Sequence, residues 1–160
     1  MNTMRKRNIE MEYDFPKDLE VVSNVKNNRF DLVKVAKIIL YKIFNYNKIN
    51  LTIAYNTKLL DQLSTKDIDL QAILINPIED VFVLYMRENA SIPDTVILAH
   101  EMWHLKQYKE KKLRMPNLQE VYWNNVKYDN SIAYEKRPWE KEALEEQYKL
   151  ERKMKSFYFV

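Results

Sequence analysis

The pattern of apolar and polar positions first identifies a helix in the N-terminal third of the chain. Between residues 31 and 44 apolar residues recur at intervals of three and four, and this spacing is typical of a half-buried helix. The apolar positions are Leu32, Val35, Ile38, Ile39 and Ile43. We therefore expect a helix over 31–44 that packs on the core.

Three short runs rich in β-branched and aromatic residues follow, at 49–55, 71–75 and 81–87. Runs of this length and composition are typical of strands. Because only the segment 76–80 separates the last two, we expect them to form a hairpin within a small, mostly antiparallel, three-stranded sheet. The run 81–87 is a candidate edge strand for pairing with a peptide, although an interior position fits it nearly as well.

Ser91, Pro93 and Asp94 together have the form of a helix start. Ser91 can serve as the N-cap, a proline suits the first turn, and an acid three residues after the cap can complete a capping box. The sequence therefore predicts a helix from about residue 92 to about residue 108.

The segment 109–136 has mixed charge, scattered aromatic residues and no sustained period. We expect a long loop there, with a candidate hairpin around 122–128, and long loops in small domains are usually functional. Pro138 then suits the first position of a last helix, whose apolar pattern continues towards Met154.

These elements together predict an α+β fold. Its parts are an N-terminal helix, a small three-stranded sheet, the helix 92–108, the long loop and a C-terminal helix. A length of 160 residues fits a single domain, 1–160, with one sizeable core. Residues 1–12 are a candidate disordered segment within it.

Composition narrows the setting in which this domain would work. No apolar run is long enough to span a bilayer, the basic start is followed by acids rather than by an apolar export signal, and there is no cysteine. We expect a cytoplasmic protein without a membrane partner. The net charge of +3 is too small to argue for nucleic acid.

The chain also has no glycine, which bears on its turns and on phosphate binding. Left-handed turns must fall to asparagine or aspartate, and the pairs Asn27-Asn28 and Asn124-Asn125 are the expected places. A glycine-rich phosphate-binding loop is excluded.

His100, Glu101 and His104 form an HExxH pattern on the predicted helix 92–108. Histidines four residues apart project from the same helix face and suit one tetrahedral zinc ion. Glu101 can then reach a zinc-bound water and accept its proton. The alternative without a metal is a pair of surface or hydrogen-bonded histidines.

The third protein ligand has to be a carboxylate oxygen, because the chain has no further histidine and no cysteine. Glu142 and Glu146 share one face of the last helix, and the small Ala143 would allow close packing around a metal. Glu140 lies close enough to compete with Glu142 as the ligand.

An HExxH helix followed by a helix with a Glu-Ala pair and a further acid resembles the gluzincin metallopeptidases, the thermolysin type, and most closely their minimal bacterial and phage forms. The resemblance covers about residues 91–147. It implies a zincin-like fold and one Zn²⁺ per chain, held by His100, His104 and Glu142. It also implies that Glu146 orients a histidine ligand.

The resemblance further implies a group that stabilises the oxyanion. Larger gluzincins use a distant histidine or tyrosine, and since no histidine remains here, Tyr134 or else Tyr128 would take this role. Lys106 departs from the family pattern, which prefers an apolar residue there. The expected reaction is hydrolysis of a peptide bond in a peptide or protein substrate, with Glu101 as the catalytic base.

Three other interpretations stand beside this one. The domain could bind zinc as a non-proteolytic interaction module, it could associate with nucleic acid through the basic residues between Lys106 and Arg114, or it could hold another divalent ion such as iron, nickel or cobalt. That basic cluster is more typical of a solvated helix end. Trp103 and Trp139 are more typical of packing between the two helices than of substrate binding.

Overall fold

The computed structural model describes residues 14–117, 119–129 and 131–160, and it has an α+β fold as expected. In chain order the elements are β1 (Leu19–Ser23), α2 (Leu32–Lys37), the π-helix η1 (Ile38–Ile43), β2 (Ile49–Tyr55), α3 (Thr57–Leu63), β3 (Ala72–Ile78), β4 (Val81–Met86), α4 (Asp94–Lys109), β5 (Leu113–Arg114), β6 (Glu120–Trp123), β7 (Val126–Asp129), the 3₁₀ turn η2 (Tyr134–Lys136) and α5 (Pro138–Tyr158). The candidate disordered segment 1–12 lies outside the described residues.

The main sheet has four strands rather than the three expected, in the order β1-β2-β4-β3. β1, β2 and β4 are parallel, and only β3 is antiparallel to its neighbour β4. The expected mostly antiparallel sheet was therefore wrong. The missed strand β1 buries only Leu19 and Val21 fully, so its apolar pattern is too short to identify it.

The position of β4 answers the question of which strand forms the edge. β4 lies inside the sheet, between β2 and β3, whereas β3 occupies one edge. Of the two readings of the run 81–87, the interior one is therefore confirmed. The two edges belong to β1 and to β3, the other strand of the expected hairpin.

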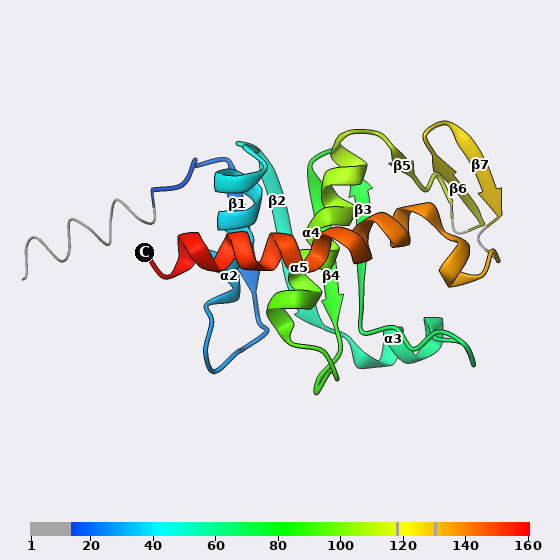
Figure 1. The fold of residues 1–160 in the computed structure, drawn as a ribbon, viewed down its shortest axis with the longest axis horizontal. Coiled ribbons are helices and arrows are strands. Elements are labelled where there is room, and N and C mark those ends of the chain that lie inside the picture. The colour runs from blue at the N-terminus through cyan, green and yellow to red at the C-terminus, as the bar shows by residue number, and fades with distance from the viewer. Residues whose placement is uncertain (1–13, 118, 130) are drawn as a thin grey trace, which may run out of the picture.

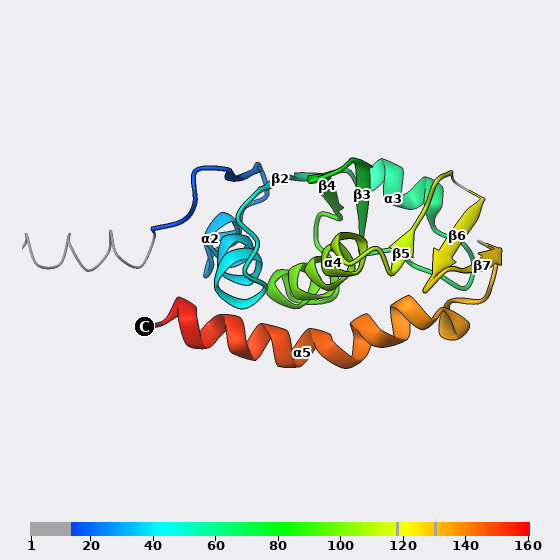
Figure 2. The same ribbon diagram turned by 90° about the horizontal axis from the view of Figure 1, so that it is seen from above.

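Two layers of helix cover one face of the main sheet. Figure 2 shows α2 and α4 directly beneath the strands, and α5 crossing beneath both of them. In Figure 1 the long α5 runs along the molecule, from the small β5-β6-β7 sheet back past α2. α4 is thus enclosed between the sheet and α5.

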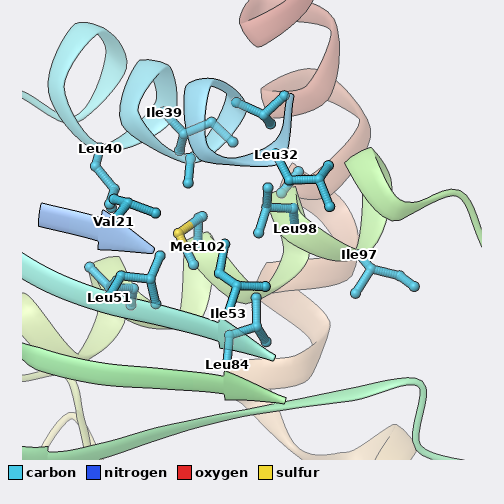
Figure 3. Packing of buried hydrophobic residues seen from close by; sticks show 14 of the residues in the cluster. Val21, Leu32, Ile39, Leu40, Leu51, Ile53, Leu84, Ile97, Leu98 and Met102 are labelled. Atoms are coloured by element: carbon cyan, nitrogen blue, oxygen red, sulfur yellow. The ribbon is translucent and has the colours of Figure 1, made fainter. Parts of the chain in front are cut away.

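The main core fills the space between the sheet and α4. Leu51 and Leu84 from the strands meet Leu98 and Met102 from α4, and none of the four is exposed to solvent (Figure 3). Burying a side chain of this kind stabilises a fold by roughly 1.5–3 kcal/mol. These contacts fix α4 on the sheet and leave its opposite face for α5.

The expected first helix is confirmed as a helical segment, although its second half is a π-helix. Asp31 caps α2 by accepting hydrogen bonds from the backbone N–H groups of Val33 and Lys34, at 3.1 and 3.2 Å. The chain then continues without a break into η1.

The expected capping box at Ser91 was wrong. α4 begins at Asp94, and the Ser91 backbone N–H donates instead to the side-chain oxygen of Gln71 at 3.1 Å. The Asp94 carboxylate accepts from the Asn27 side chain at 3.0 Å. Both groups therefore tie the helix start to other segments rather than to its own backbone.

The expected long loop contains a second, three-stranded sheet in the order β5-β6-β7. The candidate hairpin is confirmed: β6 and β7 are joined by Asn124 and Asn125, whose φ angles of 49° and 66° are left-handed. The strands are only two to four residues long, too short for their pattern to be recognised. The left-handed turn expected at Asn27-Asn28 was wrong, because neither residue has a positive φ.

A small second core joins this sheet to α5. It consists of Leu113, Val121, Trp123 and Trp139. Trp139 lies in the first turn of α5 and stacks edge-on against Tyr128, with ring centroids 5.5 Å apart. The small sheet thus fixes the start of α5.

Within the described part of the chain, no helix combines the length and apolarity that a membrane span requires.

Candidate metal centre

His100 and His104 lie on the face of α4 that meets α5. Their Nε2 atoms are 3.2 Å apart, and the ring planes meet at 83°. His104 is buried and His100 is partly exposed. Both histidines therefore project from the same face of the helix, as expected, and they lie between two helices.

Glu140, in the first turn of α5, completes this group. Its Oε1 lies 3.2 Å from Nε2 of His100 and also contacts Nε2 of His104. Trp139 and Ala143 are buried on either side of Glu140 along the helix, and their packing sets the rotation that turns Glu140 towards α4. One carboxylate oxygen thus faces both imidazoles.

Glu142, expected as the third ligand, does not join the histidines. Two residues along a helix correspond to a rotation of about 200°, so Glu140 and Glu142 cannot both face the same point. The Glu142 carboxylate accepts hydrogen bonds from Nε1 of Trp103 at 2.8 Å and from Nε2 of Gln107 at 3.3 Å. The structure therefore places Glu140, the alternative to Glu142, beside the two histidines.

Two glutamines, rather than Glu146, orient the histidines. Gln147 places its Oε1 2.8 Å from Nδ1 of His100, and Gln107 places its Oε1 2.7 Å from Nδ1 of His104. Because an amide oxygen can only accept, each Nδ1 carries a proton, and Nε2 is the nitrogen that can bind a metal once it has lost its own proton. Glu146 is only partly exposed, and its carboxylate lies 3.9 Å from Nζ of Lys149.

Gln107 is itself fixed by α5. Its Nε2 donates to the backbone carbonyl of Trp139 at 3.0 Å and to Glu142, so its amide cannot turn round without losing both bonds. Glu142 therefore acts on the site through Gln107. Gln147 follows Glu140 by two helical turns, so the helical spacing could have placed both on one face of α5. A glutamine is not by itself typical of a metal site, and Gln147 was therefore not predicted from the sequence.

The three groups shift one another's pKa in the metal-free protein. Burial alone would lower the pKa of His104, but the Glu140 carboxylate raises it to about 9. The pKa of His100 is raised for the same reason, again against the effect of burial. Burial would raise the pKa of Glu140, yet the two imidazoles hold it well below its usual range.

Two of the three separations between the candidate ligand atoms match those around a tetrahedral divalent ion, and the third, between Glu140 and His104, is a closer contact. Bonds of about 2.0–2.1 Å in a tetrahedron place the ligand atoms roughly 3.3 Å apart. The separations of Nε2 of His100 from Nε2 of His104 and from Oε1 of Glu140 are both 3.2 Å. Two neutral imidazoles and one carboxylate are a donor set that zinc favours, leaving a fourth position open.

Glu101 is the second carboxylate near this point. Its oxygen and the histidine nitrogens all lie within 4.8 Å of one another, so it could also be counted among the ligands. Glu140 is the better ligand because its oxygen touches both Nε2 atoms, whereas Glu101 follows His100 on the same helix. Burial raises the pKa of Glu101 above its usual range, although both histidines oppose this.

A cleft of about 300 Å³ opens beside these groups, with His100, Glu101 and Glu140 in its wall. Tyr134, the expected oxyanion group, lines the same cleft and hydrogen-bonds the Glu140 carboxylate. Burial and this neighbouring charge raise the pKa of Tyr134, so the hydroxyl keeps its proton. The alternative, Tyr128, packs on Trp139.

The edge strand and the segment before it form another wall of the cleft. Residues from Asp67 to Ala72, where β3 begins, line it opposite α4 and α5. The cleft is therefore bordered on one side by His100 and Glu140 and on another by the start of the edge strand β3.

The other sequence features have structural roles. In the basic cluster, Lys106 pairs with Glu110 and Lys109 pairs with Asp80. Trp103 packs against Phe44 at the end of η1, with ring centroids 5.9 Å apart, and its contact with α5 is the hydrogen bond to Glu142. Comparisons with protein-family models, with curated proteins and with solved structures found no match.

Proposed function

We propose that the protein is a zinc-dependent metallopeptidase that hydrolyses peptide bonds. The observation that carries the proposal is the convergence of Nε2 of His100, Nε2 of His104 and Oε1 of Glu140 beside a cleft. His100, Glu140 and Glu101 line this cleft. A purely structural zinc site would have no need of a buried carboxylate beside an open ligand position. Glu101 supplies such a group.

The chain divides the chemistry among few residues. Zinc held by His100, His104 and Glu140 would polarise the substrate carbonyl and make its bound water more acidic. Gln147 and Gln107 hold the histidines in the tautomer that presents Nε2. Proton transfer and stabilisation of the oxyanion are assigned to Glu101 and Tyr134.

Glu101 moves the proton in this scheme. As the water oxygen forms its bond to the carbonyl carbon, the carboxylate accepts a proton from the water. It then passes the proton to the amide nitrogen, whose bond to that carbon breaks, so that an acid and an amine leave. A carboxyl whose pKa is raised by burial is suited to both accepting and returning a proton.

Tyr134 supports the oxygen on which negative charge develops. Its hydroxyl would turn from the Glu140 carboxylate towards the carbonyl oxygen of the substrate and donate a hydrogen bond there. Because its pKa is raised, it remains a donor throughout the working range of pH.

The test measures metal content and peptidase activity on the same preparations. Protein purified without a histidine tag is analysed by elemental mass spectrometry as wild type, His104→Ala, Glu140→Ala and Glu142→Ala. We expect about one zinc per wild-type chain, loss of zinc with His104→Ala and Glu140→Ala, and retention with Glu142→Ala.

Activity is then followed on a mixed peptide library by mass spectrometry. Zinc-loaded wild type should cut peptides, and Glu101→Gln should bind zinc without cutting. No zinc after reconstitution would overturn the metal site, whereas zinc without cleavage of any peptide or protein substrate would favour the non-proteolytic interaction module.

A further inference from the structure

The charges around the cleft are of one sign. Its lining includes four carboxylates, those of Asp67, Asp69, Glu101 and Glu140, and no lysine or arginine among the described residues. The chain as a whole has a net charge of +3, so this is a local departure from its overall balance. The cleft should therefore attract cations and repel acidic ligands.

Two of these carboxylates are already committed to the metal centre. Glu140 faces the histidines and Glu101 lies beside them, so a divalent ion would balance both charges. Asp67 and Asp69 remain, on the wall that leads into the edge strand β3. The side chain of Asp69 is 81% exposed, so a ligand can reach its carboxylate from solvent.

Arg87 holds this wall in place without neutralising it. Its Nε donates to the Leu70 carbonyl at 3.0 Å, and its guanidinium pairs with Asp61 at 2.5 Å and with Asp69 at 3.6 Å. One cation is thus shared by two aspartates, and Asp67 has no ion pair within the described residues. Lys66, the neighbouring cation in sequence, does not line the cleft.

The rest of the cleft offers apolar surface. The apolar lining comes from the segment before β3, from α4 and the segment before it, and from α5. The larger side chains are Leu70, Ile92, Val96, Ile97 and Leu144. Ile92 and Leu144 are 40% and 46% exposed, which leaves apolar area at the rim for a ligand to cover.

We propose that the cleft selects an extended peptide segment in which a large apolar residue lies near a lysine or arginine. The apolar side chain enters between α4 and Leu70, and the cation meets Asp67 and Asp69 on the wall beside the edge strand. This inference rests on the proposed function for its substrate, but it concerns binding and can be tested without turnover.

The binding experiment uses the zinc-loaded Glu101→Gln protein, which keeps the metal ligands. The probes are fluorescein-labelled decapeptides with a central leucine in a Gly-Ser background, one lysine being walked through the other positions. Norleucine replaces that lysine in the neutral counterpart and glutamate in the acidic one. Fluorescence anisotropy gives the dissociation constant of each peptide.

We expect at least one lysine position to bind roughly two- to fivefold more tightly than norleucine, with glutamate weaker than both. Asp67→Asn with Asp69→Asn should remove that preference, and Asp67→Lys should reverse it. The matched control is Glu79→Gln, which removes an exposed carboxylate outside this cleft and should leave the preference unchanged. Raising the salt concentration should weaken the preference.

Equal binding of the lysine and norleucine peptides at every position would overturn the inference, as would a preference that survives both asparagine substitutions. A lysine preference in binding combined with no cleavage by wild type would instead count against the peptidase proposal alone. The two failures are therefore distinguishable.

Discussion

The two faces of α4 differ in what they bury and in what they need from their neighbours. The face towards the sheet carries Leu98, Met102 and Leu105, all with no exposed area. The face towards α5 carries His100 and His104, with Glu101 and Gln107 also buried. Apolar burial stabilises almost regardless of which apolar partner is present, whereas each buried polar group needs a matching partner at hydrogen-bond distance.

This difference separates stability from function along one helix. The apolar face holds α4 on the sheet, and its contacts would serve any protein of this fold. The polar face contributes little to stability for the number of groups it removes from water, because desolvation opposes their pairing. We infer that its arrangement serves metal binding and catalysis.

The largest effect that would sharpen this contrast is expected for Glu101→Gln. Loss of the catalytic base should reduce kcat/KM by roughly 10²- to 10⁴-fold. Zinc content should stay the same, and the melting temperature should not fall, because the change removes a buried ionisable group. Peptide cleavage assays and calorimetry on the zinc-loaded variants measure both quantities. Full activity in Glu101→Gln would break the assignment of the base.

A smaller effect, of opposite character, is expected for Leu98→Ala on the apolar face. Emptying this fully buried position should lower the free energy of unfolding by about 2–5 kcal/mol, while zinc is still bound by the folded protein. Denaturant unfolding gives the change. The control is Leu63→Ala at a 42% exposed position, where a change of roughly 0.5 kcal/mol or less is expected.

The parts of the site that depend on one helix alone could be predicted from the sequence, whereas the parts that depend on a partner element could not. The spacing of His100 and His104 within one helix placed both on one face, because helical geometry fixes that relation without any partner. The choice between Glu140 and Glu142 depends on the rotation of α5 about its axis. That rotation is set by Trp139 packing into the second core, which rests on strands too short to predict.

The fold shows the same limit. The segments later confirmed as helices had several turns of regular spacing, whereas β1 and the small sheet offered at most five residues each. The parallel pairing of β1, β2 and β4 arises from contacts between distant segments, which no local pattern contains. The expected cap at Ser91 failed for this reason too, since its partner Gln71 comes from another part of the chain.

The third effect concerns the glutamines that orient the histidines. Gln147→Ala or Gln107→Ala should each weaken zinc binding by roughly 10- to 100-fold, because the imidazole loses the acceptor that fixes its tautomer. Titration against a fluorescent zinc chelator measures the affinity. Gln147→Glu restores an acceptor and should recover binding, which a merely structural defect would not allow.

Glu146→Ala is the matched control for this comparison, since it changes a partly exposed residue on the same helix whose carboxylate pairs with Lys149 and not with the histidines. Its zinc affinity should equal that of wild type. A loss comparable to that of Gln147→Ala would return the orienting role to Glu146 and break the site as described.

The smallest expected effect is the change in zinc affinity caused by one unit of pH. It arises because zinc and a proton compete for Nε2 of His104. Since the pKa of His104 is raised to about 9 in the metal-free protein, zinc must displace a proton from it at neutral pH. Zinc affinity should therefore fall by about tenfold for each unit by which the pH drops below this value. Chelator titrations between roughly pH 6.5 and 8.5 measure the slope.

The stability of the metal-free protein should fall as the pH rises, whereas zinc affinity should increase. Pairing of protonated His104 with Glu140 stabilises that form fully below the ordinary histidine pKa of 6.5, and the contribution is lost as the pH rises towards about 9. The difference in melting temperature between zinc-loaded and metal-free protein should therefore widen across this window. Glu142→Ala, which leaves both groups in place, should show the same widening. A difference that does not change with pH would mean that zinc does not bind through Nε2 of His104.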